Sequence, residues 1–358
     1  MASSTNMARI ATTVRPEMNV EINMSTVSSK IVSEETTTSV YENAGPVTIL
    51  FILGALGNAV AVGVLCCNVK THKWRPFHRF VCALAISDGG GILASYPFAE
   101  YRYISEFKVD FSKPVCDFVG FVFMFTLMSS AMIVCCMSLD RFFATFYPFQ
   151  YNSPSKGFRT NVILAIVWCL SGILSSLHLY GLGSSRTFYP GSWCFLNFID
   201  VNSNNSQATQ NIIYSYIYAL TGLAVLLLMV GANTAVVLYF LRNRCILKKS
   251  TKSTRDLQII IFLLIIVVVF TSLWSPLMII IIQHASGVIR GDGETELVLL
   301  RMGVTNSVLD PWIYILFRKE ILILLLRAVE MVTRRKLSIL QKLSPNRSVC
   351  DQRTTFNR

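Results

Sequence analysis

Seven apolar stretches, each long enough to cross a lipid bilayer, constrain this chain more than any other feature. A helix needs about 20 mainly apolar residues to cross ~30 Å of hydrocarbon. Helices are the expected spanning elements, because a membrane β-barrel is built from shorter segments of alternating polarity. The seven stretches lie at roughly 46–67, 79–101, 115–139, 161–182, 211–241, 257–283 and 297–317. The sequence therefore predicts an all-α membrane protein, a bundle of seven transmembrane helices.

The charged residues predict how the bundle is oriented. Only 15% of the residues are charged, whereas soluble domains carry about a quarter. Lysine and arginine gather after the first, third, fifth and seventh stretches, and such residues mark the cytoplasmic side. They include Lys70, Lys73, Arg75, Lys156, Arg159, Arg242, Arg244, Lys248, Lys249, Lys252, Arg255, Arg318 and Lys319. We expect a multi-pass plasma-membrane protein with its N-terminus outside and its C-terminus inside. The net charge of +12 then reflects orientation, and no nucleic-acid partner is expected.

The segments outside the bundle also carry predictions. The N-terminal segment has no apolar run, so a cleaved signal peptide is not expected, and Asn23 and Asn204 stand in glycosylation sequons. An aliphatic face after the seventh stretch predicts an amphipathic helix on the inner leaflet. The expected organisation is an extracellular tail at 1–45, a membrane domain at 46–317, a membrane-surface helix at 318–333 and a disordered cytoplasmic tail at 334–358.

Three ionisable residues fall within the spans, where they are costly and by default mark function. They are Asp88, Arg301 and Asp310. The two aspartates either have a structural role between helices or belong to a polar cluster that holds a sodium ion or a water network. Residues that would complete such a cluster are Asn58, Ser130 and Asn306.

Arg301 differs from the two aspartates because its neighbours in sequence include no carboxylate. It stands about one turn into its span, ~6 Å along a helix. A guanidinium in apolar surroundings favours a planar acid with two oxygens. One interpretation is that Arg301 reaches outward or pairs with Glu100 or Asp117. The other is that it binds the carboxylate of a ligand.

The membrane portion resembles the rhodopsin-like G-protein-coupled receptors. The matching residues, in order along the chain, are Gly57-Asn58, Leu84-Ala85-Ile86-Ser87-Asp88, Asp140-Arg141, Trp168, Trp274-Ser275-Pro276 and Asp310-Pro311-x-x-Tyr314. Two departures narrow the ligand class. Phe123 stands where amine receptors carry an aspartate, and Val304 stands where opsins carry the lysine that binds retinal.

Two segments are similar to those of prostanoid receptors. One is the loop Tyr189-Pro190-Gly191-Ser192-Trp193-Cys194-Phe195, and the other is Leu309-Asp310-Pro311-Trp312 with Arg301 before it. The loop looks most like that of the prostaglandin E2 receptor of the fourth E subtype. Trp274-Ser275-Pro276 resembles other E-type and thromboxane receptors more, and the loop at about 242–255 is shorter than in the fourth subtype. The implied ligand is prostaglandin E2 or another prostanoid or acidic lipid.

The resemblance assigns roles to individual residues. Arg301, Tyr103 and Ser192 would bind the prostaglandin carboxylate, and a Cys116–Cys194 disulfide would hold the loop over the site. The apolar lining would include Phe123, Trp193 and Trp274. A heterotrimeric G protein, expected to act on cAMP, would couple at the inner side. The switch residues would be Asp140, Arg141, Asp310, Pro311 and Tyr314.

Asp256, at the start of the sixth span, adds a hypothesis of its own. It could pair with Arg141 at rest, or it could simply favour a helix N-terminus. Other function classes have less support. The four histidines are too dispersed for a catalytic centre, no metal-ligand spacing is present, and no cofactor or enzymatic activity is expected. A transporter is the remaining alternative, although no repeated halves are visible.

Overall fold

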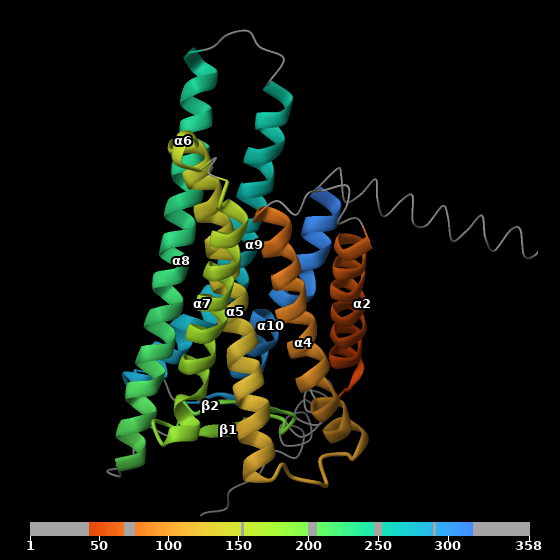
Figure 1. Ribbon diagram of the computed structural model, residues 1–358. Coiled ribbons are helices and arrows are strands. Elements are labelled where there is room, and N and C mark those ends of the chain that lie inside the picture. Colours follow the sequence, from red (N-terminus) through yellow and green to blue (C-terminus); the bar gives the residue numbers. More distant parts are fainter. Residues whose placement is uncertain are drawn as a thin grey trace, which may run out of the picture. The chain divides into compact units, whose positions relative to one another are not determined.

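All seven apolar stretches form helices in the computed structural model, which describes residues 43–67, 76–151, 154–199, 206–246, 253–288 and 291–317. Hydrocarbon offers no hydrogen-bond partners, and a helix pairs its backbone N–H and C=O groups with one another. The bundle comprises α2 (Gly45–Cys67), α4 (Pro76–Ile104), α5 (Lys113–Phe146), α7 (Lys156–Ser176), α8 (Ser206–Ile246), α9 (Ser253–Ala285) and α10 (Gly293–Phe317) (Figure 1). The predicted seven-helix bundle is therefore confirmed.

The helix ends differ from the predicted bounds. Helix α5 continues past 139 to Phe146, and α8 continues past 241 to Ile246. Hydropathy identifies only the apolar part of a helix, which lies in the hydrocarbon. The helix itself continues through the polar residues that follow this apolar part. Helix α7 instead ends at Ser176 and passes into the 3-10 turn η1 (Leu177–Tyr180), which stops at Gly181 with φ +91°. A left-handed residue of this kind ends a helix.

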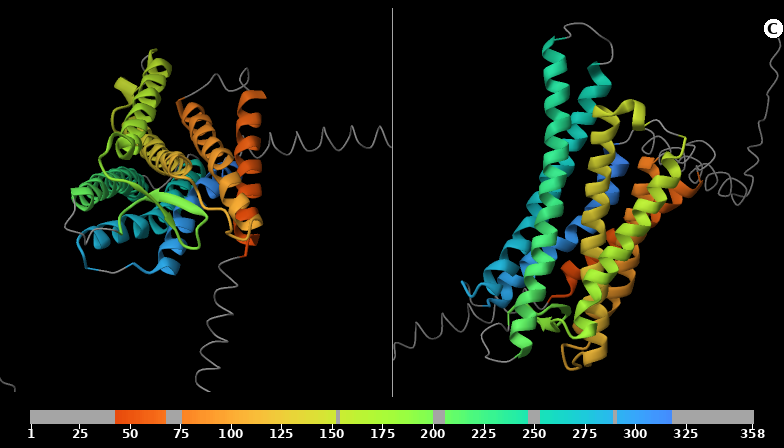
Figure 2. Two further views of the ribbon diagram at one scale, coloured as in Figure 1. Left: turned by 90° about the horizontal axis from the view of Figure 1, so that it is seen from below. Right: turned by 60° about the vertical axis from the view of Figure 1, so that its left-hand side comes forward.

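Helix α5 is the central element of the bundle. It packs against α4, α7 and α8, while α10 packs against α9 and α2 (Figures 1 and 2). Helices α4 and α5 approach closely at Gly91, where a Cβ atom would overlap the side chain of Thr126. The absence of a side chain at Gly91 therefore sets the spacing of these two helices.

The outer faces of the helices are apolar. Large side chains lie exposed on α2, α7 and α8, among them Ile49, Leu56, Ile173, Leu227 and Leu228. Six of the described helices are long and apolar enough to cross a membrane. Helix α10 is not among them, since it carries Arg301 and Asp310 along its length. Apolar surface of this extent is rare on soluble monomers, and it suits contact with lipid.

A two-stranded antiparallel hairpin lies across one end of the bundle. Strand β1 (Ser185–Phe188) pairs with β2 (Trp193–Leu196), and both strands contact α5 (Figure 2). We call this end of the bundle the hairpin end. The short helix α6 (Pro148–Tyr151) follows α5 at the opposite end, which we call the α6 end (Figure 1).

Several predictions fall outside the described residues. They concern the tail up to residue 42 with Asn23, the sequon at Asn204, the surface helix at 318–333 and the tail at 334–358.

Candidate ligand-binding site

Three residues predicted to bind a carboxylate lie together at the hairpin end. Arg301, on α10, donates from Nη2 to the hydroxyl oxygen of Tyr103 on α4, over 3.0 Å. Ser192, in the turn before β2, donates to the same oxygen over 3.4 Å. Tyr103 and Ser192 are both buried. Two helices and the hairpin turn thus supply one group of hydrogen-bonding side chains.

Arg301 makes no ion pair with a carboxylate among the described residues. Asp117, one of the two partners considered from sequence, bonds to Lys113 and Ser185 instead. The Nε atom of Arg301 is buried without a hydrogen-bond partner. Arg301 as a whole is partly buried. A cation shielded from water is destabilising without an anion beside it, so the guanidinium retains the capacity to bind one.

Aromatic side chains form the wall beside Arg301. The indole of Trp193, on β2, meets the ring of Tyr96 edge-on at 5.1 Å and lies 5.7 Å from the ring of Phe123. Phe123 in turn contacts Phe195 of β2 at 5.5 Å. The hairpin therefore inserts Trp193 between α4 and α5 and packs Phe195 against α5. Such edge-to-face pairs stabilise by about 0.5–1.5 kcal/mol beyond their buried area.

One small cavity is lined in part by Arg301, and a second shares Tyr96, Phe123 and Val304 with it; both are almost closed. The first is bounded by Tyr96, Phe123, Trp193, Leu300, Arg301 and Val304, whose side chains leave no room for a water molecule. The other, bounded by Tyr96, Phe123, Thr126, Val304 and Ser307 among others, has a volume of about 10 Å³. Small-molecule sites usually offer about 300–1,000 Å³. A ligand that reaches Arg301 must therefore displace side chains, and Trp193 and Tyr96 line the same cavity as Arg301.

Tyr96 is a site residue that the sequence reading missed. It lines both cavities, and its hydroxyl is buried without a hydrogen-bond partner. The spacing of seven residues between Tyr96 and Tyr103 could have shown it, because residues i and i+7 share a helix face. The Trp193 indole nitrogen is likewise buried and unpartnered. Both groups offer a ligand a hydrogen bond that the described residues leave unfilled.

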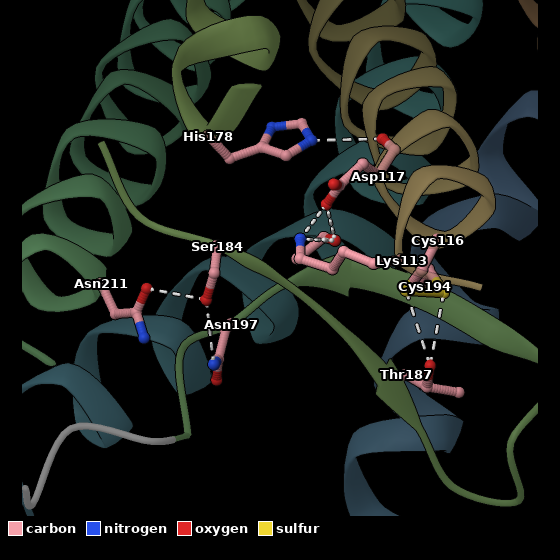
Figure 3. Close-up of polar contacts among 10 residues, drawn as sticks. Lys113, Cys116, Asp117, His178, Ser184, Thr187, Cys194, Asn197 and Asn211 are labelled. Atoms are coloured by element: carbon pink, nitrogen blue, oxygen red, sulfur yellow. Dashed lines mark hydrogen bonds and ion pairs between the residues drawn. A yellow bond between two sulfur atoms is a disulfide. The ribbon is translucent and has the colours of Figure 1, made fainter. Parts of the chain in front are cut away.

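The hairpin is tied to α5 by covalent and polar contacts, shown in Figure 3. The predicted disulfide joins Cys116 of α5 to Cys194 of β2. One residue along α5, the Asp117 carboxylate accepts a hydrogen bond from Ser185 of β1 over 2.5 Å and pairs with Lys113. The backbone oxygen of Asp117 lies 3.2 Å from Nε2 of His178. The Asp117 side chain therefore positions the hairpin rather than binding Arg301.

A buried arginine, Arg102, fixes the hairpin turn from the α4 side. Its Nε donates to the backbone oxygen of Gly191 over 2.8 Å, and its Nη2 pairs with Asp110 at 3.0 Å. The guanidinium also lies over the rings of Phe107 and Phe111. Gly191 has φ +111°, a conformation that favours glycine. Arg102 escaped the sequence reading, since a basic residue just beyond a span looks like an ordinary interfacial residue.

Trp274 is not among the residues that line the two small cavities. It is buried on α9, its ring is 5.8 Å from that of Phe270, and it packs closely against Gly222 of α8. A role of Trp274 in ligand contact therefore stays a prediction.

The predicted polar cluster is buried near the middle of the bundle. Asp88, Asn58, Ser130, Asn306 and Asp310 all have little exposed surface. Ser130 donates to Asp310 over 3.5 Å, and Asn58 donates to the backbone oxygen of Ser307 over 3.1 Å. Both carboxylate oxygens of Asp88 are buried without a hydrogen-bond partner. The cluster thus offers carboxylate and hydroxyl oxygens to a small cation, although in the described chain no group of three or more His, Cys, Asp or Glu side chains forms a metal site.

At the α6 end, two of the predicted switch residues, Asp140 and Arg141, share a network with Tyr151, which was not predicted from the sequence. Arg141 donates to Asp140 Oδ2 over 2.7 Å, and the hydroxyl of Tyr151 on α6 donates to Asp140 Oδ1 over 2.9 Å. Burial, helped by the nearby Asp140 carboxylate, raises the pKa of Tyr151 to about 12. The hydroxyl of Tyr151 therefore stays protonated, and remains a donor, at neutral pH. Asp140 has both oxygens engaged.

A ring of α4 connects this network to the other predicted switch motif. The guanidinium of Arg141 lies 5.4 Å from the Phe77 ring, and the same ring is 6.1 Å from that of Tyr314. Tyr314 follows Asp310 and Pro311, which lie inside α10. Asp256 belongs to α9, but its side chain is outside the described part. The Arg141–Asp256 pair therefore stays a hypothesis.

Sequence comparison finds receptors similar to this chain. The human prostaglandin E2 receptor EP4 subtype is 27% identical over 325 residues, with 77% of this chain and 65% of that receptor covered. The bovine prostaglandin E2 receptor EP3 subtype is 28% identical, with 78% and 74% covered. The human thromboxane A2 receptor is 27% identical, with 76% and 82% covered. The match thus spans less than two thirds of the EP4 receptor's length.

The fold is shared with a solved receptor structure. A crystal structure of squid rhodopsin aligns with a TM-score of 0.66 at 17% identity, covering 82% of this chain and 86% of that chain. The model of the family described as "7 transmembrane receptor (rhodopsin family)" matches residues 57–314. This chain is therefore a multi-pass membrane protein that belongs to the rhodopsin family of seven-transmembrane receptors.

Proposed function

We propose that this chain is a receptor for a prostanoid, a lipid acid such as prostaglandin E2, and that it signals to a heterotrimeric G protein. The observation that carries the proposal is Arg301, a guanidinium beneath the hairpin that has no carboxylate partner among the described side chains. Tyr103 and Ser192 place two hydroxyl groups beside it.

The chemistry of the site suits a lipid acid. A guanidinium can bind both oxygens of a carboxylate, and Tyr103 can add a third hydrogen bond. The lining beyond Arg301 is mostly apolar and includes Phe123, Leu300 and Val304. Each CH₂ group of a ligand buried there would contribute about 0.8 kcal/mol. The anionic head would thus set the orientation of the ligand, and the hydrocarbon chains would supply most of the affinity.

We infer that the hairpin end faces outside and the α6 end faces the cytoplasm. The basic residues Lys156, Arg159 and Arg242 lie at the ends of helices that meet the α6 end, as cytoplasmic residues do. The network of Asp140, Arg141 and Tyr151 would then be the site that responds to the G protein. The nearly closed cavities at the hairpin end fit a resting state whose population a ligand shifts.

Prostaglandin E2 is the favoured ligand because receptors named for it are among the similar proteins. In that case the expected response is a change in cAMP. Thromboxane A2 receptors are also among these relatives. Another prostanoid is therefore the second candidate.

The test is a panel of prostanoids applied to cells that express the chain, with cAMP and calcium read together. GTP exchange on an added G protein, measured in membranes, would separate a receptor from a transporter. Arg301→Ala should lower the potency of the acid at least a hundredfold, but that of its methyl ester much less. Lys108→Ala is the control, since Lys108 is an exposed cation at the same end of the bundle. Equal losses for acid and ester would contradict a carboxylate bound at Arg301.

A further inference from the structure

A cavity at the α6 end is far larger than the two small cavities lined by Tyr96 and Phe123. It has a volume of about 490 Å³ and lies between α4, α5, α6 and α7. This volume is within the range of small-molecule sites, about 300–1,000 Å³. Its walls are largely apolar and include Phe80, Leu139, Phe143 and Ile163. Its size and lining suit a hydrocarbon chain.

The polar residues of this cavity carry a net positive charge. Lys156 and Arg159, at the start of α7, both line it, and neither pairs with a carboxylate among the described residues. Asp140 is the one carboxylate in the lining, and it is already bonded to Arg141 and Tyr151. The cavity therefore offers two uncompensated cations next to an apolar space.

We propose that this cavity binds an anionic phospholipid of the bilayer, with one acyl chain along the apolar wall and the phosphate on Lys156 and Arg159. Charge complementarity selects the head group, because basic pockets between helices bind anionic lipids. The position of the cavity selects a lipid over a soluble anion. Phe143 and Ile163 line the cavity and are also exposed on the outer surface of the bundle, so an acyl chain can enter from the surrounding lipid.

The bound phosphate would lie beside the switch network. Tyr151 lines the same cavity and donates to Asp140, and Arg159 Nη2 donates to the backbone oxygen of Tyr151 over 3.5 Å. A phosphate on Arg159 would restrain α6 through this contact. The lipid would therefore favour the state in which Tyr151 holds Asp140. This inference concerns a different site from the prostanoid proposal and does not depend on it.

The binding test uses the full chain in detergent and native mass spectrometry to count bound lipid. The probes are dioleoyl phosphatidate, dioleoyl phosphatidylcholine, oleate and inorganic phosphate. Phosphatidate should bind at least tenfold more tightly than phosphatidylcholine, and inorganic phosphate should not displace it. Lys156→Gln and Arg159→Gln should each weaken phosphatidate binding about fivefold, or about 1 kcal/mol. Arg242→Gln, which removes an exposed cation outside the cavity lining, should have no effect.

A second variant tests the cavity itself rather than the charge. Ile163→Trp adds bulk at a position that is 41% exposed, so the variant should fold, as its melting temperature would show. It should abolish the preference for phosphatidate without removing a cation. Unchanged binding by Ile163→Trp, or equal binding of phosphatidate and phosphatidylcholine, would overturn the proposal. Oleate binding as tightly as phosphatidate, and lost in the same variants, would overturn the phospholipid in favour of a fatty acid.

Discussion

Arg301 donates a hydrogen bond to the hydroxyl of Tyr103 over 3.0 Å and thereby joins α10 to α4 across 198 residues of sequence. The contact is polar, and at its centre is a cation that no described carboxylate neutralises. Ser192 reaches the same hydroxyl from the hairpin turn. Any movement of α10, α4 or the hairpin therefore changes the geometry of the proposed anion site.

Tyr103→Phe should weaken binding of a prostanoid acid at least tenfold. The substitution removes one hydrogen bond to a charged group, which contributes about 1.5–3 kcal/mol, while Arg301 keeps its charge. The affinity for the methyl ester should change much less, because the ester presents no negative charge. Competition binding with the acid and its ester would measure both.

Tyr101→Phe is the matched control for this prediction. Tyr101 stands two residues earlier on the same helix, and its side chain is exposed, so its hydroxyl cannot reach Arg301. The Tyr101→Phe variant should bind the acid and the ester with the same affinities as the parent chain. An acid affinity unchanged in Tyr103→Phe would mean that the Tyr103 hydroxyl does not contact the ligand.

Removing the disulfide should loosen the hairpin. Cys116→Ser breaks the only covalent link between α5 and β2 in the described chain, and a disulfide typically contributes about 2–4 kcal/mol. We expect a lower melting temperature. We also expect weaker prostanoid binding, because Trp193 belongs to the hairpin and would move with it. The Asp117–Ser185 hydrogen bond remains, so partial folding should persist.

Cys169→Ser provides the comparison for the disulfide, because Cys169 is an exposed free cysteine on α7. Melting temperature and ligand affinity should both stay at the parent values. If the two variants melted at the same temperature, the disulfide would not stabilise the hairpin.

The bundle could be predicted because membrane spans have a strong signal in sequence. Long apolar runs such as 211–241 leave little choice but a helix. The bounds were less accurate, as the end of α7 at Ser176 and its 3-10 continuation show. Where a helix enters the interface, polar residues tolerate both a helix and a turn, so hydropathy no longer distinguishes them.

The candidate site was predicted only in part. Arg301 stood out because a charge in an apolar helix is rare, and the resemblance to prostanoid receptors supplied Tyr103 and Ser192. The roles of Tyr96, Asp117 and Arg102 depend on which elements meet in three dimensions. Tyr96 faces the hairpin, while neighbouring apolar residues face lipid. Both environments favour apolar residues, so the sequence does not distinguish the two faces of the helix. The closed state of the cavities depends on rotamers that no motif encodes.

Gly91→Ala should destabilise the bundle by about 1–3 kcal/mol, the usual range for an overpacked core. The new methyl group would overlap Thr126 and push α4 away from α5. Gly90→Ala is the matched control on the same helix, since a Cβ there meets nothing within 4 Å. Alanine is the better helix former by about 1 kcal/mol, so this variant should melt slightly higher.

A compensating change would locate the cause of the Gly91→Ala effect. Thr126→Ala removes the two outer atoms that the new methyl would meet. The double variant should therefore recover much of the lost stability, as measured by thermal unfolding in detergent. If the double variant recovered none of the lost stability, the strain would not arise from contact between the new methyl group and Thr126.

Tyr151→Phe and Asp140→Asn should both raise basal GTP exchange on the G protein. Each variant removes a contact of the network in which Asp140 holds Arg141. The effect of Asp140→Asn should be the larger, because this substitution removes the ion pair with Arg141 and also weakens the hydrogen bond from Tyr151. Tyr180→Phe, at an exposed position of the hairpin end, should leave basal exchange unchanged at matched surface expression.

Asp256 provides the final prediction, because the structure already shows Arg141 paired with Asp140. If Asp256 also holds Arg141 at rest, Asp256→Asn should raise basal exchange, and the double variant with Asp140→Asn should exceed either single one. Two carboxylates that share one guanidinium are coupled, so the two effects should not simply add. If Asp256 only favours the start of α9, Asp256→Asn should lower the melting temperature slightly and leave basal exchange unchanged. Measuring both quantities in the three variants distinguishes the two roles.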